Sequence, residues 1–291
     1  MVIAFLVVVA VVRPARTTIF TPFSSPLHTQ HTHAAHAAIV FNRDQHPQPH
    51  PAFPAATTPS GRWPRLRRLK LLCLGRVDEI APLLTDRTPG WTAFCALIIL
   101  LGCGLYGTSV GLWRSPLQSA YTGLKIPLLI FLTCAGNALL NGLLGQVLGS
   151  GLGFRQATSA IILSFVTAAC ILGAFSPLAF FILYNTPALA SVDQGAGHSI
   201  TLLTHVGLIA YAGIMANIRL LSLLHRFAPD RRAARTTLLA WLGGNLLLGS
   251  QLSWVLRPFI GSPGLPVEFL RSDPLRGNFF EAVRAAIQQL L

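Results

Sequence analysis

The chain has 291 residues, of which 52% are hydrophobic and only 11% are charged, and its mean hydropathy is +0.58. Soluble domains usually carry about 25% charged residues, so the composition argues against a soluble globular enzyme and indicates a membrane protein with several spans. The same numbers exclude a disulfide scaffold or a wholly disordered chain. The net charge of +13 comes almost entirely from arginine, because Lys70 and Lys125 are the only lysines.

The first part of the chain, residues 1–90, is a basic, low-complexity segment in which no span is predicted. Its apolar run over residues 1–12 is too short to cross a bilayer and lacks the flanking signals of a cleaved signal peptide. Residues 28–59 are rich in His, Pro, Ala and Thr and are predicted to be disordered. After the first residue no Met occurs before Met215, so an alternative interpretation is that residues 1–60 precede the true start.

The second part, residues 91–256, is predicted to be an all-α polytopic transmembrane helix bundle. Residues 91–184 contain three basic residues and no acid, as expected in hydrocarbon, where a charge costs ~3 kcal/mol or more. About 20 residues are needed to span the bilayer core. Five stretches meet this length, over residues 92–112, 127–148, 157–184, 200–224 and 236–256. The third is overlong and contains Pro177, which predicts a kink rather than a sixth span.

Two amphipathic segments flank these spans. Leucines and a tyrosine recur at helical spacing from Leu117 to Leu128, which predicts a short helix lying in the interface between the first two spans. Residues 257–291 form the third part, a C-terminal loop followed by an amphipathic helix. Asn278 and Glu281 have the spacing of an N-cap and its N3 partner. The apolar stripe of this helix is formed by Phe280, Val283, Ile287 and Leu290.

The distribution of Lys and Arg predicts the orientation. Seven basic residues lie between Arg62 and Arg87, before the first span, and four lie between Arg226 and Arg235, whereas residues 185–199 contain no Lys or Arg. Basic loops stay in the cytoplasm. We therefore expect a multi-pass protein of a bacterial inner (plasma) membrane with a cytoplasmic N-terminus and, with five spans, an external C-terminus.

A serine and a histidine raise the question of catalysis. Gly107-Thr108-Ser109-Val110-Gly111 matches G-x-S-x-G, and His205 lies in the fourth predicted span. An intramembrane serine hydrolase would need this kind of pair, but the nucleophile elbow requires a strand-to-helix turn. The two glycines also form G-x-x-x-G, which favours close helix packing. We expect packing and no enzymatic activity.

Polar side chains within the spans are the next candidates. Asn137 and Asn141 lie one turn apart on one face, and His205, Asn245 and Gln251 add polar groups to the later spans. Such groups serve either as interhelical hydrogen bonds or as a path for a substrate or ion. No Asp, Glu, Lys or Arg lies deep in any predicted span, so we expect the structural role; a transport component remains the alternative.

Metal and cofactor binding have little support. Six histidines, at positions 28, 31, 33, 36, 46 and 50, could supply imidazoles, but they lie in low-complexity sequence. The five cysteines form no C-x-x-C pair and are expected to pack as small apolar residues. We therefore expect no metal, no cofactor and no nucleic-acid partner.

The segment after the last span is dense in conformationally restricted residues. Proline limits φ and glycine reaches conformations closed to other residues, so this segment holds one backbone path. Its simplest interpretation is a helix stop with an aromatic anchor, and the alternative is a loop that docks a partner. The interface candidates are Trp254, Arg257, Pro258, Phe259, Gly261, Pro263, Phe280 and Ile287.

The layout resembles a known family over roughly residues 110–256. Five spans, with Phe154-Arg155-Gln156 leading into an apolar span, are similar to the bacterial relatives of the Yip family. This resemblance implies a cytoplasmic N-terminus and a compact five-helix bundle. The segment from Trp254 to Pro266 is similar to the end of a set of uncharacterised bacterial membrane proteins, some labelled as actin-binding, but no actin-binding motif is visible.

Together these features predict a membrane scaffold or accessory subunit that binds other membrane proteins or lipids. A transport component and an intramembrane hydrolase built on Ser109 and His205 are the two alternatives.

Overall fold

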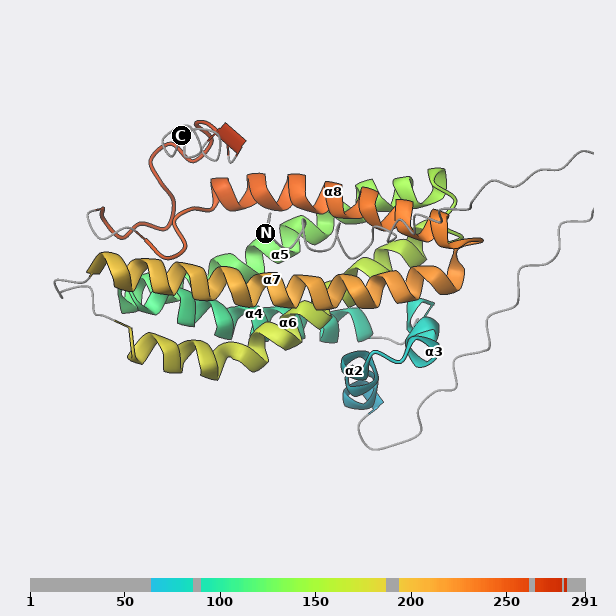
Figure 1. Ribbon diagram of the computed structural model, residues 1–291, viewed down its shortest axis with the longest axis horizontal. Coiled ribbons are helices and arrows are strands. Elements are labelled where there is room, and N and C mark those ends of the chain that lie inside the picture. Colours follow the sequence, from blue (N-terminus) through green and yellow to red (C-terminus); the bar gives the residue numbers. More distant parts are fainter. Residues whose placement is uncertain (1–63, 86–89, 187–193, 262–264, 279, 282–291) are drawn as a thin grey trace, which may run out of the picture.

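The computed structural model describes residues 64–85, 90–186, 194–261, 265–278 and 280–281. Regular structure in these residues is helical, and none of them lies in a strand (Figure 1). The prediction of an all-α fold is confirmed for this part of the chain.

Five long helices lie side by side and form the bundle (Figure 1). They are α4 (Trp91–Leu112), α5 (Pro116–Val147), α6 (Phe154–Tyr184), α7 (Gln194–Phe227) and α8 (Arg231–Val255). Helix α4 packs against α5 and α6, α6 packs against α7, and α5 packs against α8.

Four helices of the described chain are long and apolar enough to cross a membrane: α4, α5, α6 and the Ile200–Phe227 part of α7. Helix α8 is not among them, because arginines occupy its first turns and its remaining residues include Gly, Ser, Asn and Gln. The structure therefore supports a multi-pass membrane protein with at least four possible spans, and the fifth predicted span exists as a helix of lower apolar content.

The distribution of side chains on α4 is that of a helix in lipid. Leu97, Leu101 and Leu105 follow one another at four-residue spacing and are each about half exposed, whereas Cys95 and Cys103 on another face are buried. Large apolar groups outside and small or polar groups inside are expected where the solvent is hydrocarbon.

The two glycines of the G-x-x-x-G motif bring α4 and α5 into close contact. A Cβ atom at Gly107 would lie 2.6 Å from the carbonyl oxygen of Thr122, and one at Gly111 would lie 2.4 Å from that of Gln118. Only glycine permits this approach of one backbone to the other, so the packing interpretation of the motif is confirmed.

Helix α5 begins eleven residues before the predicted second span. Ser115 caps it by accepting a hydrogen bond from the amide of Gln118 at 3.0 Å, and Pro127 lies inside the helix. The predicted separate interfacial helix over Leu117–Leu128 is therefore wrong, because proline is tolerated within membrane helices. Lys125, which precedes the predicted second span, lies within α5.

Helix α6 includes Pro177 and continues through it as one helix, so no sixth span arises there. Before the bundle, α2 (Pro64–Leu74), α3 (Val77–Ile80) and the 3-10 helix η1 (Ala81–Leu84) form short elements that were not predicted. Helix α2 lies across the direction of the long helices, near one end of the bundle (Figure 1). The predicted disorder and the alternative start within residues 1–60 lie outside the described residues.

The predicted C-terminal cap is present. Asn278 Oδ1 accepts a hydrogen bond of 2.9 Å from the amide of Glu281, and residues 280–281 are helical. The rest of this predicted amphipathic helix, including Ile287, lies outside the described residues.

Candidate functional site

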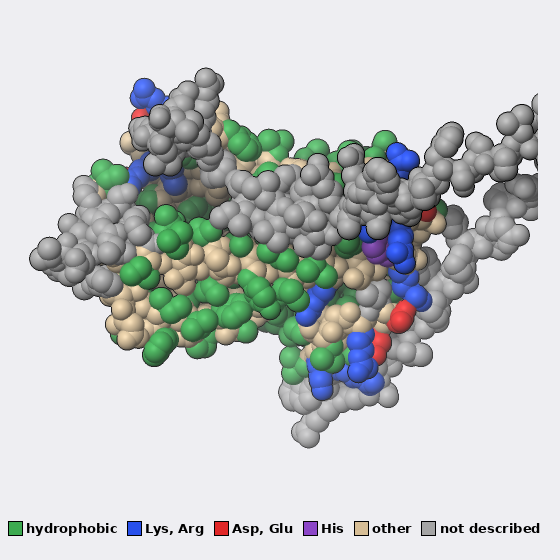
Figure 2. Space-filling view, in the orientation of Figure 1, with side chains coloured by type: hydrophobic (Ala, Val, Ile, Leu, Met, Phe, Trp, Pro, Cys, Tyr) green, Lys and Arg blue, Asp and Glu red, His purple; other side chains and the backbone are tan. Residues whose placement is uncertain are grey.

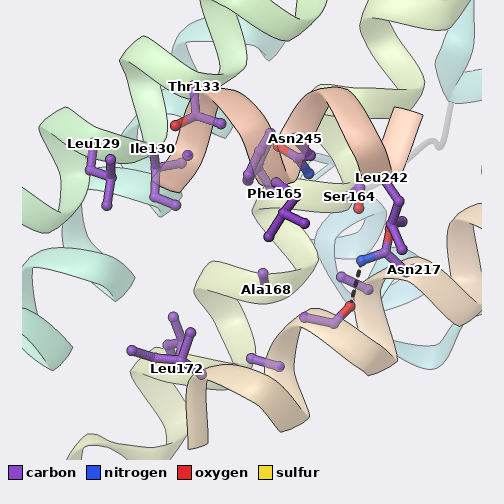
Figure 3. Close-up of a pocket in the computed structure, with 16 residues that line it drawn as sticks. Leu129, Ile130, Thr133, Ser164, Phe165, Ala168, Leu172, Asn217, Leu242 and Asn245 are labelled. Atoms are coloured by element: carbon purple, nitrogen blue, oxygen red, sulfur yellow. Dashed lines mark hydrogen bonds between the residues drawn. The ribbon is translucent and has the colours of Figure 1, made fainter. Parts of the chain in front are cut away.

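A cavity of about 170 Å³ lies among α5, α6, α7 and α8 (Figure 3). Most of its wall is apolar and is formed by residues such as Leu129, Ile130, Phe165 and Leu172. A concave, mostly apolar site with a few polar groups is the usual form of a small-molecule site. In a membrane-spanning bundle, such a wall suits a lipid chain or another lipophilic molecule.

Four polar side chains interrupt this wall: Asn217, Asn245, Thr133 and Ser164. Asn217 Nδ2 donates to the carbonyl oxygen of Gly213 at 2.7 Å, one turn earlier in α7 (Figure 3). Asn245 Oδ1 accepts from Asn137 Nδ2 at 2.5 Å. The third is Thr133, which is only 4% exposed and whose hydroxyl has no hydrogen-bond partner among the described residues. A buried hydroxyl without a partner costs about 1–3 kcal/mol, and Thr133 Oγ1 is such a group within this wall.

The predicted asparagine cluster is present at the contact between α5 and α8, where Asn245 also lines the cavity. Asn141 Nδ2 donates to Asn137 Oδ1 at 3.2 Å, and Asn137 in turn bonds Asn245 on α8. Asn137 and Asn141 are both buried. This chain of amides joins α5 to α8, as expected of interhelical hydrogen bonds. Gln251, which was also a candidate, lies half-buried farther along α8.

His205 lies elsewhere, in the contact between α4 and α7. Its Nδ1 is hydrogen-bonded to the Tyr106 hydroxyl at 2.8 Å, and the two rings meet edge to face with centroids 5.4 Å apart. The Ser109 hydroxyl donates instead to the carbonyl oxygen of Tyr106 at 2.6 Å. Ser109 and His205 thus each bond to Tyr106, and the structure does not pair them as a nucleophile and base.

A second arrangement joins the start of α5 to the loop that follows α8. Lys125, fully buried, donates from Nζ to the carbonyl oxygen of Pro258 at 2.7 Å. Gln118 Nε2 donates to the carbonyl oxygen of Phe259 at 2.7 Å, and Thr122 Oγ1 lies 2.6 Å from the same oxygen. We name these three α5 side chains and the two loop carbonyls the loop latch.

Aromatic rings complete the surroundings of the ammonium group. Lys125 Nζ lies 5.0 Å from the ring centroid of Phe269 and 5.9 Å from that of Phe259, within the range of cation–π attraction. Tyr121 packs edge to face on Phe269, with centroids 5.3 Å apart. The Pro258 carbonyl oxygen and the two ring faces therefore replace water around this buried charge.

Two of the remaining interface candidates, Trp254 and Arg257, contact each other and other residues of the C-terminal loop. The Arg257 guanidinium stacks 3.8 Å from the Trp254 ring centroid and donates to the Trp254 carbonyl oxygen at 2.7 Å. Trp254 Nε1 donates to the carbonyl oxygen of Arg276 at 3.2 Å. Gly261 adopts a positive φ of 84°. Pro263 lies outside the described residues, and Phe280 is 42% exposed.

Sequence reasoning missed the loop latch, although one signal was available. Gln118, Thr122 and Lys125 lie at i, i+4 and i+7, which makes a polar stripe on an otherwise apolar helix. Its partners could not be found because they are backbone carbonyls more than 130 residues away.

Metal-binding groups are not gathered in the described part of the chain, where no three His, Cys, Asp or Glu side chains lie together. The histidines at positions 28 to 50 lie outside it. The Cys73 thiol, on α2, is perturbed: a hydrogen bond with Cys170 and the nearby Arg219 guanidinium outweigh desolvation and lower its pKa to about 6.

Comparisons of the chain with protein-family models, with curated proteins and with solved structures found no match. The Yip-family resemblance therefore stays a prediction.

Proposed function

We propose that the chain is a non-catalytic integral membrane protein, a scaffold or accessory subunit, that binds a lipid or another lipophilic molecule in the cavity among α5, α6, α7 and α8. The observation that carries this proposal is the cavity itself, whose wall is mostly apolar and includes the buried Thr133, a residue whose hydroxyl has no partner among the described residues. A ligand with an apolar body and one hydrogen-bonding group would suit such a wall.

The asparagine cluster favours this role over transport. Asn137 bonds both Asn141 and Asn245, so these amides hold α5 and α8 together. We therefore assign them to the scaffold of the site.

The proposed topology has five spans, with α8 as the fifth, a cytoplasmic N-terminus and an external C-terminal loop in a bacterial inner membrane. Supporting it, α8 packs along α5 for much of its length and ends beside the turn between α4 and α5. The basic residues near α2 and the α7–α8 turn share one end of the bundle, as the positive-inside rule requires of the cytoplasmic side.

Photolabelling in reconstituted membranes tests the cavity. A phospholipid with a photoactivatable group in its acyl chain should label cavity peptides of the wild type. Ala168, which lines the cavity on α6, can be changed to Phe to fill it, and the matched control is Ala174→Phe on the exposed face of the same helix. We expect Ala168→Phe to reduce labelling of the cavity peptides at least several-fold and Ala174→Phe to leave it unchanged. Equal labelling of the two variants would refute the proposal.

Thr133→Val gives an independent readout, because it removes the hydroxyl and keeps the shape. If a ligand uses the hydroxyl, the variant should bind the photoactivatable lipid less tightly. If the cavity takes no ligand, the variant should only be more stable, since a buried unpaired group has been removed.

A further inference from the structure

Charge is distributed very unequally between the two ends of the bundle. Around α2, α3, the start of α6 and the α7–α8 turn, the described residues include eleven Lys or Arg and three acids. Around the α4–α5 turn and the C-terminal loop they include five Lys or Arg, counting the buried Lys125, and three acids. Figure 2 shows blue side chains over α2 and near the α7–α8 turn, and a smaller group near the C-terminal loop, while the described surface between them is mostly hydrophobic or uncharged. The end that carries α2 is therefore an anion-attracting surface.

A small polar pocket lies within this basic end. It has a volume of about 80 Å³ and lies between the first turns of α4 and α6, next to η1. Arg155 and Ser159 reach it from α6, where a four-residue spacing places them on one face, and Thr92 and Trp91 line it from α4. One guanidinium and two hydroxyls in such a small space form a set of donors suited to an oxyanion.

Arg155 is the cation of this pocket that remains available for a ligand. Arg76 and Arg226 at the same end form ion pairs with Glu79 and Asp78, at 2.9 Å and 2.6 Å. Arg155 is exposed and has no acidic partner among the described residues. A guanidinium matches phosphate oxygens through two parallel hydrogen bonds, which makes arginine well suited to recognise a phosphate group.

The surroundings of the pocket place it at the depth of lipid headgroups. Trp91 lies beneath the Arg68 guanidinium, 5.6 Å from ring centroid to Cζ, and stacks on Phe94, an aromatic arrangement typical of the membrane interface. Apolar side chains complete the pocket wall, including Ile162 and Leu163 on α6.

We infer that the pocket between α4 and α6 binds the phosphate group of an anionic phospholipid in the leaflet on the α2 side. Arg155 contributes charge and two hydrogen bonds, and Ser159 and Thr92 contribute hydroxyl donors. This site is separate from the interhelical cavity and does not depend on the function proposed for it.

Thermal unfolding of the full chain in detergent, titrated with defined lipids, tests the inference. Phosphatidylglycerol should raise the unfolding temperature of the wild type at a lower concentration than phosphatidylcholine does. Arg155→Gln should increase the phosphatidylglycerol concentration needed for half of the shift roughly tenfold, the effect of losing a charge-assisted hydrogen bond. The matched control is Arg232→Gln, at the same end of the bundle but outside the pocket, which should change it little.

Two other results would overturn the inference. If Arg155→Gln and Arg232→Gln weaken the lipid effect equally, the basic end attracts lipid through diffuse charge and has no site. If soluble glycerol 3-phosphate produces the same Arg155-dependent shift at the same concentrations, the ligand is a free phosphate ester and not a lipid. Should Arg155→Gln fail to fold, Ser159→Leu, which fills the pocket and keeps the charge, should abolish the preference for phosphatidylglycerol, and an unchanged preference would contradict the site.

Discussion

Lys125 Nζ, inside α5, donates a hydrogen bond of 2.7 Å to the carbonyl oxygen of Pro258, 133 residues later in the chain. An ammonium group within a membrane helix is costly unless it is paired. Here the loop after α8 supplies the partner, so burial of the charge and docking of the loop depend on each other. The loop latch therefore fastens the C-terminal loop to the start of α5.

Removing the lysine should release this loop. Lys125→Met keeps much of the side-chain volume and removes the donor, and we expect a loss of about 1.5–3 kcal/mol in the free energy of unfolding, typical for a hydrogen bond to a charged group. Trypsin cleavage after Arg271 should become faster. The control is Leu124→Met, whose side chain is 57% exposed and does not take part in the latch. Cleavage as slow as in the wild type would show that the loop is held by other contacts.

Replacing the glycines of α4 should separate it from α5. A Cβ at Gly111 would lie 2.4 Å from the Gln118 carbonyl oxygen, so Gly111→Ala must displace backbone and should cost about 1–3 kcal/mol. Gly207 on α7 has no neighbouring atom within 4 Å of such a Cβ. Gly207→Ala should therefore be neutral or stabilising by up to about 1 kcal/mol. Thermal unfolding in detergent compares the two, and equal effects would contradict the close contact of α4 and α5.

The Cys73 thiol should react at unusually low pH. Its pKa is lowered to about 6, first by the hydrogen bond with Cys170 and then by Arg219, so the folded state favours the thiolate. The rate of alkylation by iodoacetamide, followed by mass spectrometry of the Cys73 peptide, should rise with pH around a midpoint near 6. Cys170→Ala should move this midpoint upward. A wild-type midpoint near 8.5, the usual value for cysteine, would contradict the described environment.

Reporter fusions should reveal the proposed topology. A reporter that works only in the cytoplasm should be active when it is fused in the turn between α7 and α8, at Pro229. A reporter that works only outside the membrane should be active when it is fused at Asp193. A third, after Asn278, should be external, because α8 returns the chain to the end where the loop latch lies. If the first two fusions give the expected signals and the third is cytoplasmic, α8 does not cross the membrane.

Helix positions followed from local patterns, and the exceptions have physical causes. Apolar length located four spans, and helical spacing placed Asn137 and Asn141 on one face, where they bond each other. The start of α5 was misplaced because Pro127, a helix breaker in water, is accepted within a packed membrane helix. Helix α2 was missed because its short sequence lies in a segment dominated by charge.

The sites themselves could be predicted only in part. The asparagines were visible as polar residues in apolar sequence, but the cavity depends on how four helices pack, which no local pattern encodes. Likewise, the polar stripe of Gln118, Thr122 and Lys125 indicates a partner, yet backbone carbonyls carry no sequence signal.

Native mass spectrometry of the detergent-extracted protein tests the central claim, that the interhelical cavity holds a lipophilic ligand, most directly. The wild type and Ala174→Phe should each retain one more lipid-like adduct per chain than Ala168→Phe does. If all three proteins retain the same number of adducts, or if none retains any while all are folded, the cavity is not a ligand site.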